Sequence, residues 1–321
     1  MKNIGYFYYK EYFREFSDED LIHLSHRGSR NLDEKMKHIT NTLLLQKVSN
    51  KPQKIEYLDY TYKQVTLKTL PPGLLIGIGY AHEVVNLKGQ FINGFYFDYT
   101  TGLPEIPGSG IKGVIRNAFP LSNEELKNKK DKFIYEAQNE TKLELINQFL
   151  NKNYSLDDVI DIRDEILDYN DIFLEAIINA NNQTIFEEEN FTPHKSELKN
   201  PIPLKFLKIK GGVKFTFRFL LKDGKISVDE KLELIIKIIT TYGIGAKTNE
   251  NYGRFEVVFQ QKPKQNGDLF EIYSKPNESF FKKLKTLNLD ENQKKEYLSK
   301  FKQKYSLDGK WAKKIIKLLG D

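Results

Sequence analysis

Residues 106–116 read IPGSGIKGVIR and combine glycines, a helix-capping residue and two cations within one short stretch. A Pro-Gly pair interrupts the chain, and Ser109 has a side chain suited to capping a helix, so we expect a helix to begin here. Lys112 and Arg116 lie four residues apart and therefore share one face of that helix. Cations beside the open amides of a helix N-terminus form a seat for a phosphate group. Two solvated cations on an ordinary surface helix are the alternative interpretation.

A second glycine-rich segment, GIGAKTNENYGRF at residues 243–255, has a similar chemical character. Gly243 and Gly245 allow backbone amides to approach a phosphate closely. The segment also supplies cations for phosphates, polar side chains for hydrogen bonds and Tyr252 for stacking on a base. A helix C-cap followed by a turn is the alternative interpretation.

Residue spacing argues against nucleotide-dependent and metal-dependent enzymes. The two glycines that a P-loop requires are missing before Lys247-Thr248, and the dinucleotide fingerprint that begins at Gly77 has His82 in place of its third glycine. The absence of cysteine excludes disulfides, zinc ribbons, iron–sulfur clusters and thiol nucleophiles. The five histidines show no metal-binding spacing, so we expect neither a metal nor a cofactor.

His82 is the one histidine with a plausible role near these segments. In a ribonuclease it would act as a general base while Lys112 steadies the phosphate. A structural or RNA-contacting role is the alternative, because no acidic partner for His82 is visible in the sequence.

The elements that must position these residues alternate between strands and helices. Strand patterns appear at 65–70 and 74–79, and Asn93-Gly94 predicts a hairpin within 91–99. A further hairpin is predicted at 202–222, turning at Gly211-Gly212 and followed by a strand with apolar residues at every second position. The remaining helix, 228–242, opens with the capping box Ser227-x-x-Glu230 and stops at Gly243. The order predicts an α+β, ferredoxin-like (RRM-like) domain, whose open sheet is a common RNA platform.

Three segments flank or interrupt this expected core of residues 61–261. Residues 1–60 read as a polar helical extension, with caps at Ser17 and Asn31. A stretch of about 121–200, rich in Asn, Glu and Lys, reads as a helical insertion. Residues 262–321 form a basic helical extension with 15 Lys and 8 Asp or Glu, a net charge of +7. The rest of the chain is nearly neutral, since the total is +6, so the basic end suggests a polyanion or an acidic partner nearby.

Composition sets the broad class of this 321-residue chain. Hydrophobic residues make up 39% and charged residues 29%, which supports a packed core rather than a disordered chain. No run of 18 apolar residues and no secretory signal is visible. We therefore expect a cytoplasmic protein with no membrane partner.

The two glycine-rich segments together resemble the RAMP superfamily of CRISPR proteins. Residues 106–116 look like the IPGSSLKGxxR motif, and residues 243–255 are similar to the C-terminal glycine-rich signature of these proteins. The form GIGAKT followed by YGRF most resembles the sixth-subunit family of the type III-B (Cmr) effector complex. Supporting matches occur at 75–79, 192–194 and 203–207. The sequence departs from the family pattern at Glu105, Gly110 and Asn251.

The resemblance implies a non-catalytic, RNA-binding end subunit that takes part in antiviral RNA interference. Such a subunit caps the complex near the 3′ end of the guide (CRISPR) RNA and contacts guide and target RNA. Its implied protein partners are the backbone RAMP subunit, the small helical subunit and the other end-cap RAMP subunit. Cleavage of target RNA belongs to the backbone subunit, so no catalytic residue is expected in this chain.

The residues that we expect to contact RNA are Gly108, Ser109, Lys112, Gly113, Arg116, Gly243, Gly245, Lys247, Thr248, Asn249, Tyr252, Arg254 and His82. Three alternatives remain open at this point. One is a RAMP-fold endoribonuclease that processes guide RNA with His82 as base, and another is a type III-A end subunit. The third is a protein adaptor that uses the basic extension and the helical insertion.

Overall fold

The computed structural model describes residues 3–14, 16–17, 19–20, 30–55, 59–77, 90–91, 93–191, 204–258, 273, 275–285 and 291–320. The chain divides into two compact units, Met1–Val258 and Phe259–Asp321. Each unit has a hydrophobic core of its own among the described residues.

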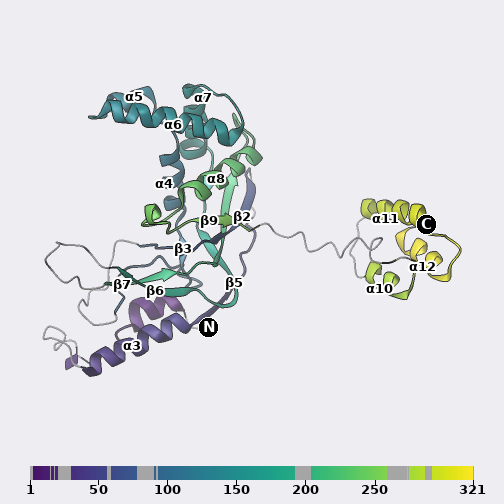
Figure 1. Cartoon of the computed structure of the whole chain (residues 1–321), viewed down its shortest axis with the longest axis horizontal. Coiled ribbons are helices and arrows are strands. Elements are labelled where there is room, and N and C mark those ends of the chain that lie inside the picture. Colours follow the sequence, from purple (N-terminus) through teal and green to yellow (C-terminus); the bar gives the residue numbers. More distant parts are fainter. Residues whose placement is uncertain are drawn as a thin grey trace. The chain divides into compact units, whose positions relative to one another are not determined.

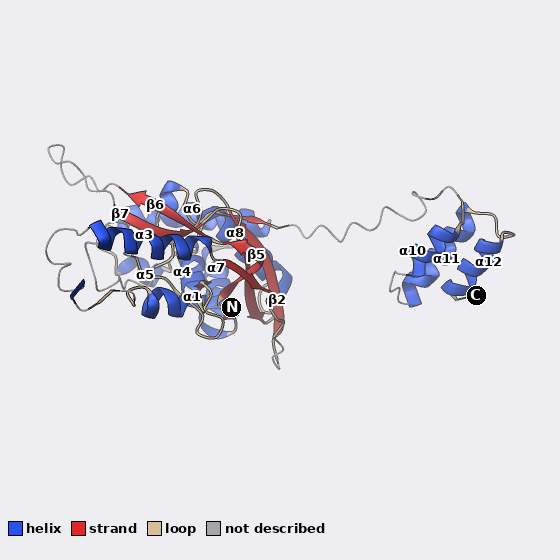
Figure 2. Cartoon of the chain, turned by 90° about the horizontal axis from the view of Figure 1, so that it is seen from below, coloured by secondary structure: helices blue, strands red, loops and turns tan. Residues whose placement is uncertain are grey.

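A sheet of seven described strands forms the centre of the first unit (Figures 1 and 2). Its main path runs β1-β5-β8-β2-β9, while β3 pairs with β5 and β4 with β8, and all pairings are antiparallel. The strands are β1 (Lys47–Asn50), β2 (Thr61–Thr69), β3 (Glu105–Ile106), β4 (Ile172–Phe173), β5 (Ala176–Thr184), β8 (Lys214–Leu221) and β9 (Phe255–Val257). Helices and an antiparallel sheet thus occur together, which confirms the predicted α+β class.

Strand β8 carries the alternation that the sequence predicted, but both of its faces are buried. Phe215, Phe217 and Phe219 belong to the hydrophobic core, as expected. Between them, Thr216 and Arg218 are only 1% and 6% exposed. These polar side chains tolerate burial because they have partners: Thr216 hydrogen-bonds Thr66 on β2, and Arg218 pairs with Glu175. The polar alternate positions therefore do not indicate a solvated face.

The helix α8 (Val228–Tyr242) follows the sequence signals at both ends. Ser227 and Glu230 exchange side-chain and backbone hydrogen bonds as a capping box. The helix stops at Gly243, whose φ of 76° lies in the left-handed region that glycine adopts without strain.

The helix α4 (Gly108–Ala118) begins slightly before the predicted cap. Pro107 is its N-cap residue, and Ser109 lies inside the first turn. The predicted apolar face is present, since Ile111, Ile115 and Ala118 are buried. Helices α4 and α8 pack against each other, and their buried residues join the core formed by the phenylalanines of β8.

A group of helices follows α4 in the chain and packs beside α8 (Figure 1). It consists of α5 (Asn123–Lys127), α6 (Lys132–Leu150), α7 (Leu156–Asp164) and the π-helical turn η2 (Glu165–Tyr169). The prediction of helix throughout 121–200 is wrong after η2, because β4, β5 and β6 (Phe186–Phe191) follow. Strand β5 escaped detection because its sequence, AIINANNQT, is rich in asparagine, a residue that is usually depleted in strands.

A separate two-stranded sheet pairs β6 with β7 (Leu204–Ile209). The two strands pair along their whole length, and ion pairs also join them: Lys205 pairs with Glu188 at 2.7 Å, and Lys208 pairs with Glu189 at 2.7 Å. The predicted hairpin across Gly211-Gly212 is wrong, since β7 pairs with β6 whereas β8 pairs with β2, β4 and β5. The two glycines still form a turn, but it passes the chain from one sheet to the other.

The predicted strand and hairpin within 74–99 are not formed by the described residues of that range. Leu74 makes a single bridge to Ile209, and Phe97 makes another to Pro104. The side chain of Asn93 explains why its Asn-Gly pair is no hairpin turn. Its amide donates to the carbonyl of Leu207 at 2.9 Å and accepts from the Leu207 N–H at 2.8 Å, so it acts as a substitute strand neighbour.

The N-terminal segment packs into the main core. It contains α1 (Ile4–Tyr6), η1 (Phe7–Glu11) and α3 (Arg30–Leu45), and Tyr8 and Tyr12 are fully buried. The predicted cap at Ser17 is supported by mutual hydrogen bonds with Asp20, although most of the helix expected there lies outside the described residues. Strand β1 within this segment corrects the expectation that residues 1–60 are purely helical.

The second unit is helical where the structure describes it. Its helices are α10 (Glu278–Lys285), α11 (Glu291–Lys304) and α12 (Lys310–Leu319). They enclose a small core that includes Phe280, Phe301 and Ile315. No helix in the described ranges is both long and apolar enough to cross a membrane.

Candidate nucleic-acid interface

A cleft of about 950 Å³ brings the two glycine-rich segments together in the first unit. The beginning of α4 lines it from one segment, and the loop between α8 and β9 lines it from the other. The lining residues used below are Tyr96, Ser109, Gly110, Gly113, Asn117, Gly245, Thr248, Asn249 and Arg254. More than 120 residues separate the two segments in sequence, so the fold creates this proximity.

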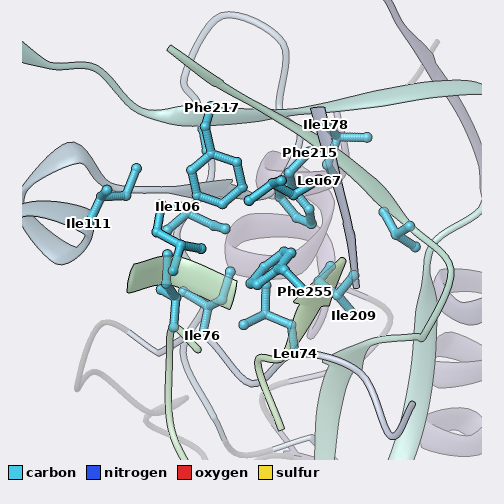
Figure 3. Close-up of a cluster of buried hydrophobic side chains, with 14 of the residues drawn as sticks. Leu67, Leu74, Ile76, Ile106, Ile111, Ile178, Ile209, Phe215, Phe217 and Phe255 are labelled. Atoms are coloured by element: carbon cyan, nitrogen blue, oxygen red, sulfur yellow. The ribbon is translucent and has the colours of Figure 1, made fainter. Parts of the chain in front are cut away.

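Buried side chains from both segments belong to one hydrophobic cluster (Figure 3). Ile106 and Ile111 anchor the start of α4, while Phe255 anchors the end of the loop. The ring of Phe255 packs edge-on against Phe217 with centroids 5.5 Å apart. Close packing of aliphatic and aromatic side chains is rigid on average, so this cluster holds the backbone segments that carry the polar residues of the cleft.

The loop from 243 to 254 is held by backbone hydrogen bonds. Ile244 N–H donates to Gly253 at 2.9 Å, Gly253 N–H to Gly73 at 2.7 Å, and Ala246 N–H to Leu75 at 2.9 Å. A Cβ atom at Gly245 would lie 2.4 Å from the carbonyl oxygen of Leu75. The backbone of Gly245 also has a φ of 98°, so packing and conformation explain this glycine without a ligand.

Two residues that the sequence assigned to RNA are used inside the loop instead. The guanidinium of Arg254 donates to the carbonyls of Thr241 and Thr248, which ties the end of α8 to the short helix η3 (Thr248–Glu250). Tyr252 is 6% exposed, and its hydroxyl donates to Glu189 at 2.7 Å. Its ring is therefore not available for stacking on a base, which corrects that prediction.

The electrostatics around Tyr252 favour this contact. Burial and the hydrogen bond to Glu189 raise the pKa of the Tyr252 hydroxyl, so it remains a donor. Partial burial raises the pKa of Glu189, but hydrogen bonds from Lys208 and Tyr252 outweigh it and leave that pKa below its usual range. Glu189 is thus an ionised acceptor that fixes the loop to the β6–β7 sheet.

Several backbone amides that border the cleft have no acceptor among the described residues. At the start of α4 this is the N–H group of Ser109, and in the loop those of Gly245, Thr248 and Asn249. Gly108 does not line the cleft, and packing explains it, because a Cβ atom there would collide with the carbonyl of Phe173. N–H groups without an acceptor at the edge of a cleft favour an anionic or carbonyl-bearing ligand.

Two glycines of α4 have no explanation within the chain. A Cβ atom at Gly110 or at Gly113 would meet nothing within 4 Å, and both residues line the cleft. Glycine in a helix costs about 0.5–1 kcal/mol relative to alanine. At these positions the wall of the cleft carries no side chain, at a cost in helix stability.

A family model for the RAMP superfamily matches residues 66–256, which is more than half of the chain. The chain belongs to the RAMP superfamily. Among solved structures, the crystal structure of Cmr6 from Pyrococcus furiosus is 21% identical with a TM-score of 0.41, and the match covers 63% of this chain and 100% of that one. The cryo-EM structure of the type III-B Cmr-beta bound to cognate target RNA contains a chain that is 21% identical with a TM-score of 0.42, covering 79% of this chain and 85% of that chain. None of the curated proteins matches this sequence.

The cations of this RAMP protein lie beside the cleft more than in it. Lys112 and Arg116 are not among the lining residues, because they lie on the neighbouring face of α4. Arg116 pairs with Asp168 at 2.8 Å, and Lys247 pairs with Glu250 at 2.7 Å. Lys112 has no ion pair among the described residues. The fold thus brings both RAMP motifs together, but of their cations Lys112, Arg116, Lys247 and Arg254 only Arg254 lines the cleft.

Some residues that line the RAMP cleft were not predicted from the sequence. Gly110, Asn117 and Tyr96 line it, and only Gly110 gave a signal, as a departure from the family motif. His82 lies outside the described residues. Within the described part of the chain, no group of three or more His, Asp or Glu side chains is arranged to hold a metal ion.

Proposed function

We propose that this RAMP protein is a non-catalytic RNA-binding subunit of a type III-B Cmr complex. In this role it caps one end of the assembly and holds the 3′ region of the guide RNA and its duplex with target RNA. The motif forms at 106–116 and 243–255 support this choice over other RAMP branches.

The observation that carries the proposal is the cleft between α4 and the loop. Its two walls come from the two motif segments, and both present amides without an acceptor among the described residues. Gly110 and Gly113 leave one wall open to close approach. A sugar–phosphate backbone fits such a surface, since it offers anionic oxygens at regular spacing and needs no base-specific contact.

The charge distribution supports recognition by shape and backbone. Arg254 is the only cation among the described lining residues, and its guanidinium is bound to two carbonyls. Lys112 and Lys247, which are neighbours of lining residues in the sequence, supply longer-range attraction for a polyanion. The lysine-rich residues 262–321 give the second unit a positive charge of its own. Affinity should therefore fall with salt by a logarithmic slope of about 0.7 for each phosphate that is neutralised on a single strand.

The architecture supports the same assignment. The strand order β5-β8-β2-β9, with α4 and α8 as the two crossovers, supports a ferredoxin-like core within 61–261. The helices from α5 to η2 then form an insertion in that core, while residues 1–60 and 262–321 are extensions. In the assembly, the backbone RAMP subunit, the small helical subunit and the other end-cap subunit are the proposed neighbours.

Isosteric charge substitution in the cleft tests this function. Asn117 and Asn249 line the cleft and are exposed, so N117D and N249D place a carboxylate opposite the phosphates without changing shape. We expect each variant to weaken binding of labelled single-stranded RNA about tenfold or more, which corresponds to about 1.4 kcal/mol. N41D, an exposed substitution on α3, is the matched control and should bind like the parent chain.

The same samples separate the proposal from its alternatives. Retarded RNA that stays intact on a denaturing gel and is released by salt supports a binding subunit. Discrete cleavage would instead favour an endoribonuclease and make His82 the next residue to replace. Equal binding by N249D, N117D and N41D would contradict a role for the cleft.

A further inference from the structure

A second cavity of about 540 Å³ lies in the first unit, between the N-terminal helices and residues 95–105. Its walls are mainly aromatic, and they include Tyr6, Tyr9, Tyr96 and Tyr99. Tyr6 is 57% exposed and Tyr99 is 97% exposed, so large rings face solvent here. We call this cavity the tyrosine pocket.

Asp98 gives the tyrosine pocket a fixed negative charge. Its carboxylate accepts hydrogen bonds from the N–H and hydroxyl groups of Thr100 and Thr101, at 2.7–3.3 Å. Partial burial raises the pKa of Asp98, but these hydrogen bonds outweigh it and leave the pKa below its usual range. The group is therefore ionised at neutral pH.

Glu105 on β3 is a second carboxylate of the tyrosine pocket, and it lacks a partner. It is partly buried, yet its side chain accepts no hydrogen bond and forms no ion pair with any described residue. Burial and the nearby charges of Glu175 and Asp98 raise its pKa. The charge of Arg218 opposes this rise without cancelling it, and the Arg218 guanidinium is already paired with Glu175.

The charge balance of the tyrosine pocket favours a cation. Lys10 is the only cation that lines it in the described chain, and Lys10 is exposed, whereas Glu105 is partly buried. Aromatic faces attract cations, and a guanidinium both stacks on rings and pairs with carboxylates. RNA is the poorer occupant, because its phosphates would face Asp98 and Glu105.

We propose that the tyrosine pocket is a docking site for an arginine side chain of a protein partner. The guanidinium stacks against the exposed tyrosine rings and pairs with Glu105, which then gains the partner that it lacks within this chain. The proposal does not depend on RNA binding by the neighbouring cleft.

Peptide titration of the full-length chain tests this site. The probe is acetyl-Gly-Arg-Gly-amide, and the readout is the NMR spectrum of the chain with ¹³C-labelled tyrosine. We expect tyrosine ring signals to shift with the arginine peptide but not with its citrulline analogue, which has the same shape without the charge. E105Q should weaken the interaction at least tenfold.

A second variant protects the test against a folding defect in E105Q. Tyr99 is almost fully exposed, so Y99A leaves the fold intact and should also weaken the interaction. F133A, at an exposed ring on α6, is the matched control and should have no effect.

Three outcomes would overturn the proposal. The first is equal shifts with the arginine and citrulline peptides, which would indicate an apolar site. The second is shifts with single-stranded RNA and none with the arginine peptide, which would indicate a nucleobase site. The third is no shift with either peptide.

Discussion

Replacing Gly113 should separate the stability of this protein from its binding of RNA. Gly113 lies in the middle of α4, has ordinary helical backbone geometry, and leaves open space where a Cβ atom would stand. G113A therefore removes the entropic penalty of a helical glycine without a clash. We expect the free energy of unfolding to rise by about 0.5–1 kcal/mol.

The thermal midpoint should rise accordingly. One kcal/mol corresponds to about 2–4 °C for a domain of this size, so G113A should unfold at a temperature about 1–4 °C higher than the parent chain. G113Q, which adds a longer side chain with good helix propensity, should also unfold no earlier than the parent.

RNA binding should change in the opposite direction. The added side chain of G113Q projects from the wall of the cleft and keeps the sugar–phosphate backbone away from the open amides. We expect the dissociation constant for single-stranded RNA to rise at least tenfold for G113Q and less for G113A, measured by fluorescence anisotropy. T42Q, an exposed substitution on α3, is the control for added bulk.

One result would refute this reasoning. If G113Q is as stable as the parent and binds RNA with the same affinity, then the glycine wall of α4 does not face RNA. The two unexplained glycines would then need another cause.

Two further predictions concern stability. R254K retains the charge but cannot reach the carbonyls of both Thr241 and Thr248, so the free energy of unfolding in urea should fall by about 1–2 kcal/mol; an unchanged midpoint would show that the guanidinium does not clamp the loop. Asp158 pairs with Lys225 at 2.6 Å, and hydrogen bonds from Lys225 and Ser155 lower its pKa to about 2. Since the folded pKa lies below the unfolded value of about 3.9, its stabilisation is present above that pH and is lost as the pH falls toward 2. The difference in thermal midpoint between the parent and D158N should therefore shrink on acidification, and a difference independent of pH would contradict the assignment.

Local sequence signals predicted the elements with self-contained patterns. The capping box of Ser227 and Glu230 and the apolar face of Ile111, Ile115 and Ala118 each involve residues within two helical turns, so both could be predicted. The alternation in β8 was equally visible in the sequence. It could not show that Arg218 and Thr216 are buried, because their partners come from other elements.

Two predictions failed for the same physical reason, which is contact between segments that are distant in the sequence. Strand β6 reads FEEENF, a poor strand by composition, but it pairs with β7, and Lys205 and Lys208 of that strand form ion pairs with Glu188 and Glu189. Asn93 pairs with the backbone of Leu207 rather than forming a turn.

In the candidate site too, local patterns predicted the segments but not the contacts of their residues. Its two segments could be found from their glycines and cations, and a shared role could be predicted from the family resemblance. No local pattern shows that Arg254 and Tyr252 form hydrogen bonds within the protein, because their partners lie elsewhere in the chain. The open space beside Gly110 and Gly113 likewise depends on the surrounding elements.

Site-specific crosslinking tests directly whether RNA occupies the cleft. The sequence contains no cysteine, so N117C, N249C and the α3 control N41C each carry a single thiol. Each variant is mixed with single-stranded RNA that bears thiol-reactive groups along its backbone. If RNA lies in the cleft, N117C and N249C crosslink in a salt-sensitive way while N41C does not. Bound RNA that leaves both cleft thiols unmodified, or modifies N41C equally, would contradict it.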